Sequence, residues 1–393
     1  MANYILFDGK EREALLPLTY TRPVGEIRIG IHRIREKWES YIGESCSYQT
    51  QDYLSAKYSK QATTLNTFIN GAVCPNENLV AAVQQLKPEE CLLSEGLVIA
   101  ACTAKDHFDW EDLSDMEQKS FSESWLHVGN LWDIFSKNGL AIHADFEKLT
   151  KGRNSQACSS SNTIIGDASL LFIEEGASVE GACINLNNGP VYIGIDAEVM
   201  EGSLIRGPFV LCEHATLKLG AKIYGPTTVG PHSKVGGEVN NSVIIGYSNK
   251  GHDGFLGNSV LGEWCNIGAD SNNSNLKNNY AEVRLWDYQS GRFAKTGLQF
   301  CGLVMGDHSK CGINTMFNTG TVVGVSANIF GAGFPRNFVA SFSWGGASGF
   351  TTYQTNKAFE VASKVMERRN LVFDEVEKNI LEKVFELSEQ YRR

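Results

Sequence analysis

Residues 193–240 read IGIDAEVMEGSLIRGPFVLCEHATLKLGAKIYGPTTVGPHSKVGGEVN. An aliphatic residue returns at every sixth place, and a mostly small or apolar residue follows four places later. A period of six fits neither the 3.6-residue period of a helix nor the two-residue period of a strand. It predicts a coil of short flat strands joined by tight turns, three strands per coil, each pointing one aliphatic side chain inward. The inward residues are Ile193, Val199, Ile205, Leu211, Leu217, Ile223, Val229 and Val235.

The repeat continues beyond this stretch but is interrupted twice. The phase slips after Val235 and returns at Leu261, and a second, Asn-rich interruption spans 270–300. Loops that leave a regular scaffold often carry function, so we expect the chemistry at these interruptions. After them the spacing of six resumes at Met305, Cys311, Phe317, Val323 and Ile329.

Composition limits the possible classes of protein. The 393 residues suggest two or three units at about 150 residues per domain. A net charge of -10 argues against a nucleic-acid binder. No apolar run approaches the roughly 18 residues that span a membrane. No secretory signal is visible and the ten cysteines form no Cys-x-x-Cys pair, so we expect reduced thiols and a cytoplasmic protein.

The chain divides into three predicted domains. Residues 1–153 alternate strand-like and helical runs, which predicts an α/β domain. Its expected strands are 4–7 and 97–102, and its expected helices are 32–40 and 79–86. A polar, Ser-rich linker at 152–162 leads to the β-helix at 163–345, and residues 355–393 are helical. We interpret this tail as a cap or subunit clasp, because one of its faces is apolar and solenoid ends need covers.

Three histidines occupy equivalent places in the repeat. His214, His232 and His308 each follow an inward aliphatic residue by three places, so they should face outward. His214 and His232 are one full coil apart and could stack. A zinc site is conceivable, but such sites need convergent ligands and no close His pair exists, so the alternative is solvated surface histidines. The metal ligands, if any, stay unknown from the sequence.

His252 lies in the first interruption, between Gly251 and Gly254. Glycines let a backbone approach a ligand closely. A neutral imidazole is suited to removing a proton from an amine that attacks a thioester. The alternative is a turn histidine without a role.

The residues around His252 resemble a known family. Gly251-His252 precedes Phe255-Leu256-Gly257, Leu261-Gly262, Asn266-Ile267-Gly268-Ala269 and an Asn-rich loop containing Asn275. This is similar to the acetyltransferase half of the bifunctional N-acetylglucosamine-1-phosphate uridyltransferase/glucosamine-1-phosphate acetyltransferases. The resemblance implies a left-handed parallel β-helix, acetyl-coenzyme A as acyl donor and a homotrimer.

The resemblance also implies site residues. His252 would be the general base, oriented by Glu238; Asn266 and Asn275 would contact substrate, and Ala269 would line the acetyl-coenzyme A site. Phe255 and Asn240 stand where the family has a Tyr and a Lys that bind the sugar phosphate, which leaves the acceptor sugar open. Lys250, Lys277 or Arg284 could supply the lost phosphate contact.

The N-terminal segment is more faintly similar to sugar-1-phosphate nucleotidyltransferases. Phe7 to Arg12 takes the place of their Gly-rich phosphate loop but has lost its second glycine. Gly9, Lys10, Arg12 and Arg22 are the candidate nucleotide-binding residues. Asp106, Asp109 and Asp133 are unresolved guesses at a metal ligand. Mg²⁺ is expected only if this domain is active, and a degenerate sugar-nucleotide-binding domain is the alternative.

These inferences predict an enzyme of sugar-nucleotide metabolism that transfers an acetyl group to an amino-sugar phosphate or nucleotide sugar. One rival is a nucleotidyltransferase whose coil serves oligomerisation or regulation. The other is a non-catalytic binder of sugar nucleotides. No nucleic-acid or membrane partner is expected.

Overall fold

The structure is a computed structural model that describes residues 3–392. The chain forms two compact units, Met1–Ile27 with His32–Asn130 and Arg28–Ile31 with Leu131–Arg393. The predicted domain boundaries stay predictions, since residues 131–153 cluster with the second unit. Residues 1, 2 and 393 of the predicted domains lie outside the described residues.

The first unit is a mixed sheet with short helices, as expected for an α/β domain. Its strand order is β2-β1-β3-β6-β5-β7. Strand β1 pairs in parallel with both β2 and β3, so their carboxyl ends share one edge. The strands are β1 Asn3–Phe7, β2 Cys46–Gln49, β3 Asn66–Asn70, β5 Glu90–Ser94, β6 Leu97–Thr103 and β7 Glu117–Ser120, with β4 Val73–Cys74 and β8 Leu126–His127 paired separately; the helices are α1 Glu11–Ala14, α2 Ile34–Ile42 and α3 Glu77–Gln84.

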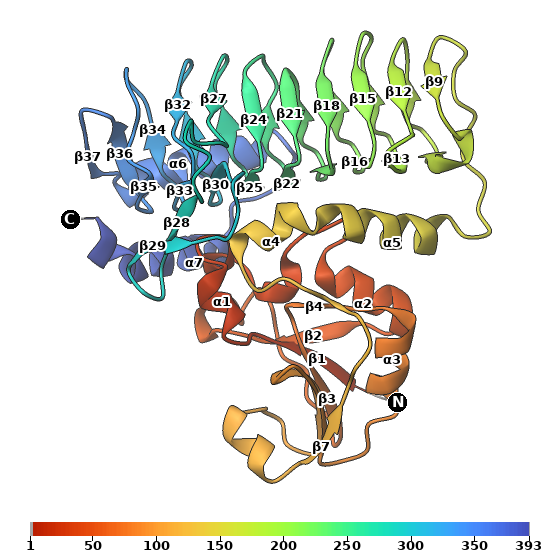
Figure 1. Cartoon of the computed structure of the whole chain (residues 1–393). Helices are drawn as coiled ribbons and strands as arrows, with labels where there is room; N and C mark the ends of the chain where they lie inside the picture. The colour runs from red at the N-terminus through yellow and green to blue at the C-terminus, as the bar shows by residue number, and fades with distance from the viewer. Residues whose placement is uncertain (1–2, 393) are drawn as a thin grey trace. The chain divides into compact units, whose positions relative to one another are not determined.

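The second unit is dominated by a parallel β-solenoid (Figure 1). Its first sheet, the β21 face, contains β9 Thr163–Ile165, β12 Cys183–Asn185, β15 Leu204–Arg206, β18 Lys222–Tyr224, β21 Glu238–Asn240 and β24 Phe255–Gly257. The β22 face contains β10 Leu171–Ile173, β13 Val191–Ile193, β16 Phe209–Leu211, β19 Thr227–Val229, β22 Val243–Gly246, β25 Val260–Glu263, β30 Leu303–Met305, β33 Thr321–Val323 and β35 Phe338–Val339. The β23 face contains β11 Ser178–Val179, β14 Glu198–Val199, β17 Thr216–Leu217, β20 Lys234–Val235, β23 Asn249–Lys250, β26 Asn266–Ile267, β31 Lys310–Cys311, β34 Asn328–Ile329, β36 Ser343–Gly346 and the antiparallel β37 Gly349–Thr352.

The predicted register of the repeat is confirmed. All eight inward residues between Ile193 and Val235 are at most 3% exposed, and they belong to one continuous core. The residues from Met305 to Ile329 with the same spacing are also buried. Matching strands lie directly above one another, as in the pairs Ile193–Leu211 and Leu211–Val229. The left-handed winding remains what the resemblance implies.

The second interruption adds short strands to the solenoid. β27 Asn272–Asn273 pairs with β32 Met316–Phe317, and β28 Arg284–Asp287 forms a hairpin with β29 Arg292–Lys295. Helices α4 Leu131–Ser136 and α5 Asn138–Thr150 precede the coil, and α5 packs Ile142 and Phe146 against Phe172 and Val210 of the β22 face.

The tail forms two helices, α6 Thr355–Glu367 and α7 Glu375–Leu387. Ile380, Leu381 and Val384 form its buried face, and the Phe385 ring lies 5.1 Å from that of Phe342. Nowhere in residues 3–392 does a helix combine the length and apolar character needed to cross a bilayer.

The predicted stack of His214 and His232 is confirmed, with ring centroids 4.8 Å apart. Three further aromatic rings, Tyr247, Trp264 and His308, extend it along the same corner. The expectation that His308 faces solvent is wrong: it is 8% exposed, because it lies at the end of this ladder against Trp264.

Candidate functional site

The loop that carries His252 fills the corner between β23 and β24 and is tightly enclosed by backbone. A Cβ at Gly237 of the preceding coil would lie 2.8 Å from the His252 carbonyl oxygen. Gly254 has φ +115°, and a Cβ there would lie 2.2 Å from the Ser271 carbonyl oxygen of the next coil. Glycine is therefore required at Gly237, which faces the loop from the preceding coil, and at Gly254, where the loop faces the next coil. The loop backbone is fixed between two neighbouring coils.

Lys250 holds the same loop from inside the solenoid. Its strand partner is Val235, so it occupies a core position that is aliphatic in the preceding coils. The side chain is 2% exposed, and Nζ donates hydrogen bonds to the carbonyl oxygens of Gly236 at 2.9 Å and His252 at 2.7 Å. Burial lowers the pKa of Lys250 to about 8, although the Asp253 carboxylate opposes this. The predicted substrate contact is thus corrected, since a buried ammonium bound to two carbonyls does not face solvent.

The His252 side chain is exposed while its backbone is held. Within residues 3–392 its imidazole makes no hydrogen bond or ion pair, so both ring nitrogens are open to a ligand. The next coil turns the same corner at Ala269, and its Asp270 N–H donates to the Asp253 carbonyl oxygen at 3.0 Å. Ala269 and His252 therefore belong to adjacent layers of one corner.

Glu238 has a different partner from the predicted one. Its Oε1 accepts a hydrogen bond from Tyr224 Oη at 2.6 Å, and the described part of the chain shows no bond from it to His252. Burial, with the Glu238 hydrogen bond and charge, raises the pKa of Tyr224 to about 12. The role of Glu238 in orienting His252 stays a prediction, and Tyr224 is the partner that the structure gives one of its carboxylate oxygens.

The remaining predicted substrate residues divide between two faces. Asn240 pairs with Gly257, and Phe255 pairs with Glu238, so these lie together on the β21 face. Asn275 joins them through Gly257, where a Cβ would lie 2.5 Å from the Phe255 ring and 2.7 Å from Asn275 Nδ2. Asn266 lies instead on the β23 face, where its Oδ1 accepts from Asn249 Nδ2 at 3.0 Å. The corner with His252 separates these two faces.

The other candidates for the phosphate contact differ in availability. Lys277 Nζ donates to the Glu282 carbonyl oxygen at 2.9 Å. Arg284 is exposed on β28, and no hydrogen bond or ion pair holds its guanidinium among residues 3–392. Arg284 is thus the more available cation.

Two asparagines that the sequence reasoning missed support the site. Gly257 N–H donates to Asn273 Oδ1 at 2.9 Å, and Asn273 Nδ2 donates to the Gly257 carbonyl oxygen at 3.1 Å. Asn272 Oδ1 accepts from Phe255 N–H at 2.8 Å. These side chains replace a backbone ladder beside β24. The spacing of six could have identified polar residues at core positions. Lys250 lies six residues after the inward Ile244, and Asn273 lies six residues after the inward Ile267.

In the first unit, the loop after β1 lies at the carboxyl edge of the parallel strands, where ligands bind in open α/β sheets. Its side chains are engaged within the protein. Asp8 accepts from Val24 N–H at 2.7 Å and from Thr50 Oγ at 2.6 Å. Burial raises the pKa of Asp8 despite these bonds.

The predicted nucleotide-binding cations of this loop also face inward. Arg12 Nη2 donates to Tyr53 Oη at 2.8 Å and to the Thr19 carbonyl oxygen at 3.3 Å. Arg22 is 3% exposed, while Lys10 is exposed at the start of α1. Nucleotide binding by Arg12 and Arg22 therefore stays a prediction, and both side chains lie mostly within the protein.

Gly9 and Glu11 explain how the loop tolerates the lost glycine. Glu11 is 3% exposed, and its Oε1 lies 3.1 Å from His127 Nε2. Burial raises the pKa of Glu11, but the hydrogen bond and the charge of His127 have the larger, opposite effect. The net pKa of Glu11 is therefore below its ordinary value. The same carboxylate folds back over Gly9, where a Cβ would lie 2.3 Å from Oε2.

The residues present do not form a ready Mg²⁺ site. Across residues 3–392 no group of three His, Cys, Asp or Glu side chains is placed to hold a metal ion. Asp133 pairs with Lys137 at 3.1 Å, and Asp109 lies 3.3 Å from His107. The three aspartates guessed from the sequence therefore gain no support as ligands.

Comparison with known proteins supports the predicted resemblance. Residues 4–154 match the sugar nucleotidyl transferase family. A bifunctional sugar-1-phosphate nucleotidylyltransferase/acetyltransferase of Sulfurisphaera tokodaii is 28% identical over 208 residues, which cover 52% of this chain and 45% of that protein. The bifunctional protein GlmU of Methanococcus vannielii is 26% identical over 283 residues, which cover 72% of this chain and 58% of that protein.

The resemblance to bifunctional enzymes of this kind is confirmed by these matches. The chain spans about half the length of the relatives it matches. Among solved structures, a UDP-N-acetylglucosamine acyltransferase of Francisella novicida aligns with 59% of this chain and 75% of its own, at 13% identity and a TM-score of 0.20. A similarity this low carries no argument.

Proposed function

We propose that the solenoid transfers an acetyl group from acetyl-coenzyme A to the amine of an amino-sugar phosphate or nucleotide sugar. The observation that carries this is an exposed histidine whose loop backbone is fixed by Lys250 and by two neighbouring coils. The relative of Sulfurisphaera tokodaii, named as an acetyltransferase, supports it.

In the proposed reaction, the amine nitrogen attacks the thioester carbonyl carbon. His252 accepts the proton that the nitrogen loses, the carbon–sulfur bond breaks, and coenzyme A leaves as the thiol after protonation. Backbone N–H groups of the coil stabilise the oxyanion. Ala269, in the adjacent layer of the corner, borders the acyl donor, and Asn240, Phe255 and Asn275 on the β21 face contact the sugar.

A homotrimer is part of this proposal, with sites between neighbouring subunits. The β21 face presents apolar side chains to solvent, among them Leu204 at 53% exposure and Tyr224 at 36%. A neighbouring coil would cover them. Sedimentation at micromolar concentration tests this, and a monomer argues against an intersubunit site.

The test of acetyl transfer is release of free thiol from acetyl-coenzyme A in the presence of a panel of amino-sugar phosphates and amino-sugar nucleotides. At least one acceptor should give thiol release that depends on both substrates. Release with none, from a folded protein, would refute the proposal.

A second activity, sugar-1-phosphate nucleotidylyl transfer, is favoured by the family match over residues 4–154. The inward-facing loop after β1 and the missing carboxylate cluster do not favour it, and we route no step through Mg²⁺. Pyrophosphate release from UTP or dTTP with a sugar-1-phosphate decides whether the domain is catalytic, or only binds sugar nucleotides.

A further inference from the structure

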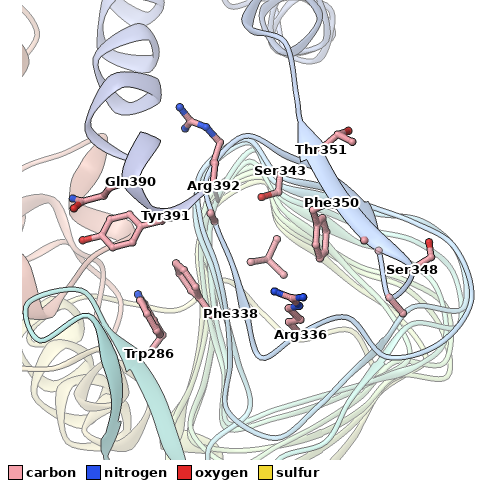
Figure 2. Close-up of a pocket in the computed structure, with 15 residues that line it drawn as sticks. Trp286, Arg336, Phe338, Ser343, Ser348, Phe350, Thr351, Gln390, Tyr391 and Arg392 are labelled. Atoms are coloured by element: carbon pink, nitrogen blue, oxygen red, sulfur yellow. The ribbon is translucent and has the colours of Figure 1, made fainter.

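The last coils of the solenoid, Trp286 of β28 and residues 390–392 line an open cavity of about 580 Å³, which we call the mouth cavity (Figure 2). Ligand sites typically measure about 300–1,000 Å³ and combine apolar walls with a few convergent polar groups. The residues of the mouth cavity that matter here are Trp286, Arg336, Phe338, Val339, Ser343 and Phe350.

Aromatic rings form its walls. Trp286 and Phe338 are stacked with centroids 4.1 Å apart, and Tyr391 meets Phe338 edge-on at 6.0 Å. Phe350, which packs on the end of the solenoid core, stands across the cavity from Phe338 in Figure 2. Val339 is 1% exposed and belongs to the same core. The cavity thus offers apolar, planar surface on two sides.

Three polar groups that line the cavity have no partner within residues 3–392, and each can donate a hydrogen bond. Arg336 is exposed, and its guanidinium makes no hydrogen bond or ion pair with residues 3–392. Ser343 is 5% exposed, yet its hydroxyl has no partner in the described chain. Trp286 Nε1 is buried and unpaired within that same part of the protein. Buried polar groups without partners are rare and need an explanation.

The charge of the cavity points the same way. Its lining contains Arg336 and Arg392 but no Asp or Glu, although the chain carries a net charge of -10. Arg392 is held by Ser388 Oγ and the Phe385 carbonyl oxygen, so Arg336 is the cation left for a ligand. An anionic ligand that bears a planar ring would accept hydrogen bonds from Arg336 and Ser343 and contact the aromatic walls.

We propose that the mouth cavity binds a nucleoside phosphate, with its base against the Phe338 and Phe350 rings and its phosphate on Arg336. Any nucleobase can stack on an aromatic side chain. The guanidinium group of an arginine can donate two parallel hydrogen bonds to phosphate oxygens. The site is distinct from the His252 corner: along the β23 face, β26, β31 and β34 lie between β23 and β36. It does not depend on the proposed acetyl transfer.

Calorimetric titration of the whole chain with AMP and UMP tests this, with the nucleosides and inorganic phosphate as half-ligands. We expect the nucleotide to bind at least tenfold more tightly than either half. Arg336→Gln should weaken binding at least tenfold, whereas Arg292→Gln, an exposed arginine on β29 outside the cavity, should leave it unchanged.

The Trp286→Phe variant tests whether the nucleotide binds in the mouth cavity. Nucleotide binding should quench tryptophan fluorescence in the native chain and not in this variant. Arg12→Ala, in the first unit, should leave this signal intact and so separates a nucleotide site there. Equal affinities of the Arg336→Gln and Arg292→Gln variants, or quenching that survives Trp286→Phe, would overturn the proposal.

Discussion

Two loops of this molecule carry similar residues and use them in opposite ways. The loop after β1 and the loop after β23 each combine a glycine with basic side chains at the end of a parallel strand. In the first, Glu11, Arg12 and Arg22 turn into the protein. In the second, only Lys250 turns inward, and His252 stays exposed.

The difference teaches that a loop side chain is available for chemistry when other groups hold the loop. Lys250 Nζ and the close glycine contacts fix residues 251–254, so the imidazole has no structural task. Arg12 is instead bound to Tyr53 and Thr19, and releasing it for a ligand would break bonds that stabilise the fold.

The largest expected effect is on catalysis by the exposed histidine. His252→Ala should lower kcat for acetyl transfer by roughly 10²–10⁴, the usual contribution of a positioned general base. Folding should be unchanged, because the side chain is exposed. His143→Ala, an exposed histidine on α5, is the matched control. Steady-state thiol release measures both, and equal activity of the two variants would remove His252 from the mechanism.

A pair of glycine substitutions sharpens the comparison of the two backbones. Gly254→Ala should lower the unfolding free energy by about 3 kcal/mol, since a left-handed residue is strained and its Cβ meets the Ser271 backbone. Gly9→Ala should lower it less, by about 1 kcal/mol, because its Cβ meets the end of the Glu11 side chain, whose displacement weakens the contact with His127 but moves no backbone. Urea unfolding compares them, and similar losses would mean that both loops are equally constrained.

The sequence predicted the solenoid well and the site only in part. Inward positions such as Leu217 follow from spacing alone, because a coil repeats the same environment every turn. The exposed corner at His252 could be expected from the phase break. The partners of Glu238 and Asn266 could not, since they depend on which outward side chains meet between strands far apart in sequence. Residue type alone also made Arg12 look like a ligand contact, whereas Tyr53, 41 residues away, holds it.

The buried lysine gives a pH-dependent test. The folded pKa of Lys250 is about 8, below the ordinary value of about 10.5, so the unfolded chain binds more protons between these values. The stability of the wild type relative to Lys250→Met should therefore be constant below pH 8. It should rise by about 3 kcal/mol as the pH increases to 10.5, since each unit of pKa shift corresponds to about 1.4 kcal/mol. Lys234→Met, an exposed lysine on β20 of the same face, should show no such rise.

Urea midpoints at a series of pH values measure this difference. A flat difference across the window would mean that the pKa of Lys250 is not lowered, because its hydrogen bonds and the Asp253 carboxylate offset the cost of burying the ammonium. Faster hydrogen exchange at 251–254 in Lys250→Met, but not in Lys234→Met, would link the lysine to the loop directly.

The smallest effect is expected in the first unit, at Arg12. If Arg12 is a structural residue there, Arg12→Ala should lower stability by about 1 kcal/mol, the net value of a hydrogen bond lost at Tyr53 or Thr19. Any nucleotide affinity should then depend little on Arg12 and on salt, because Nη2 of its guanidinium is already bonded to Tyr53 and Thr19. Lys10→Ala is the control for stability alone, since this exposed side chain makes no bond within residues 3–392. Hydrogen exchange across residues 3–27 and calorimetry with UTP at two salt concentrations measure both effects. Unchanged exchange together with a steep, salt-dependent loss of affinity would restore Arg12 as a ligand contact, and the two loops would then work alike.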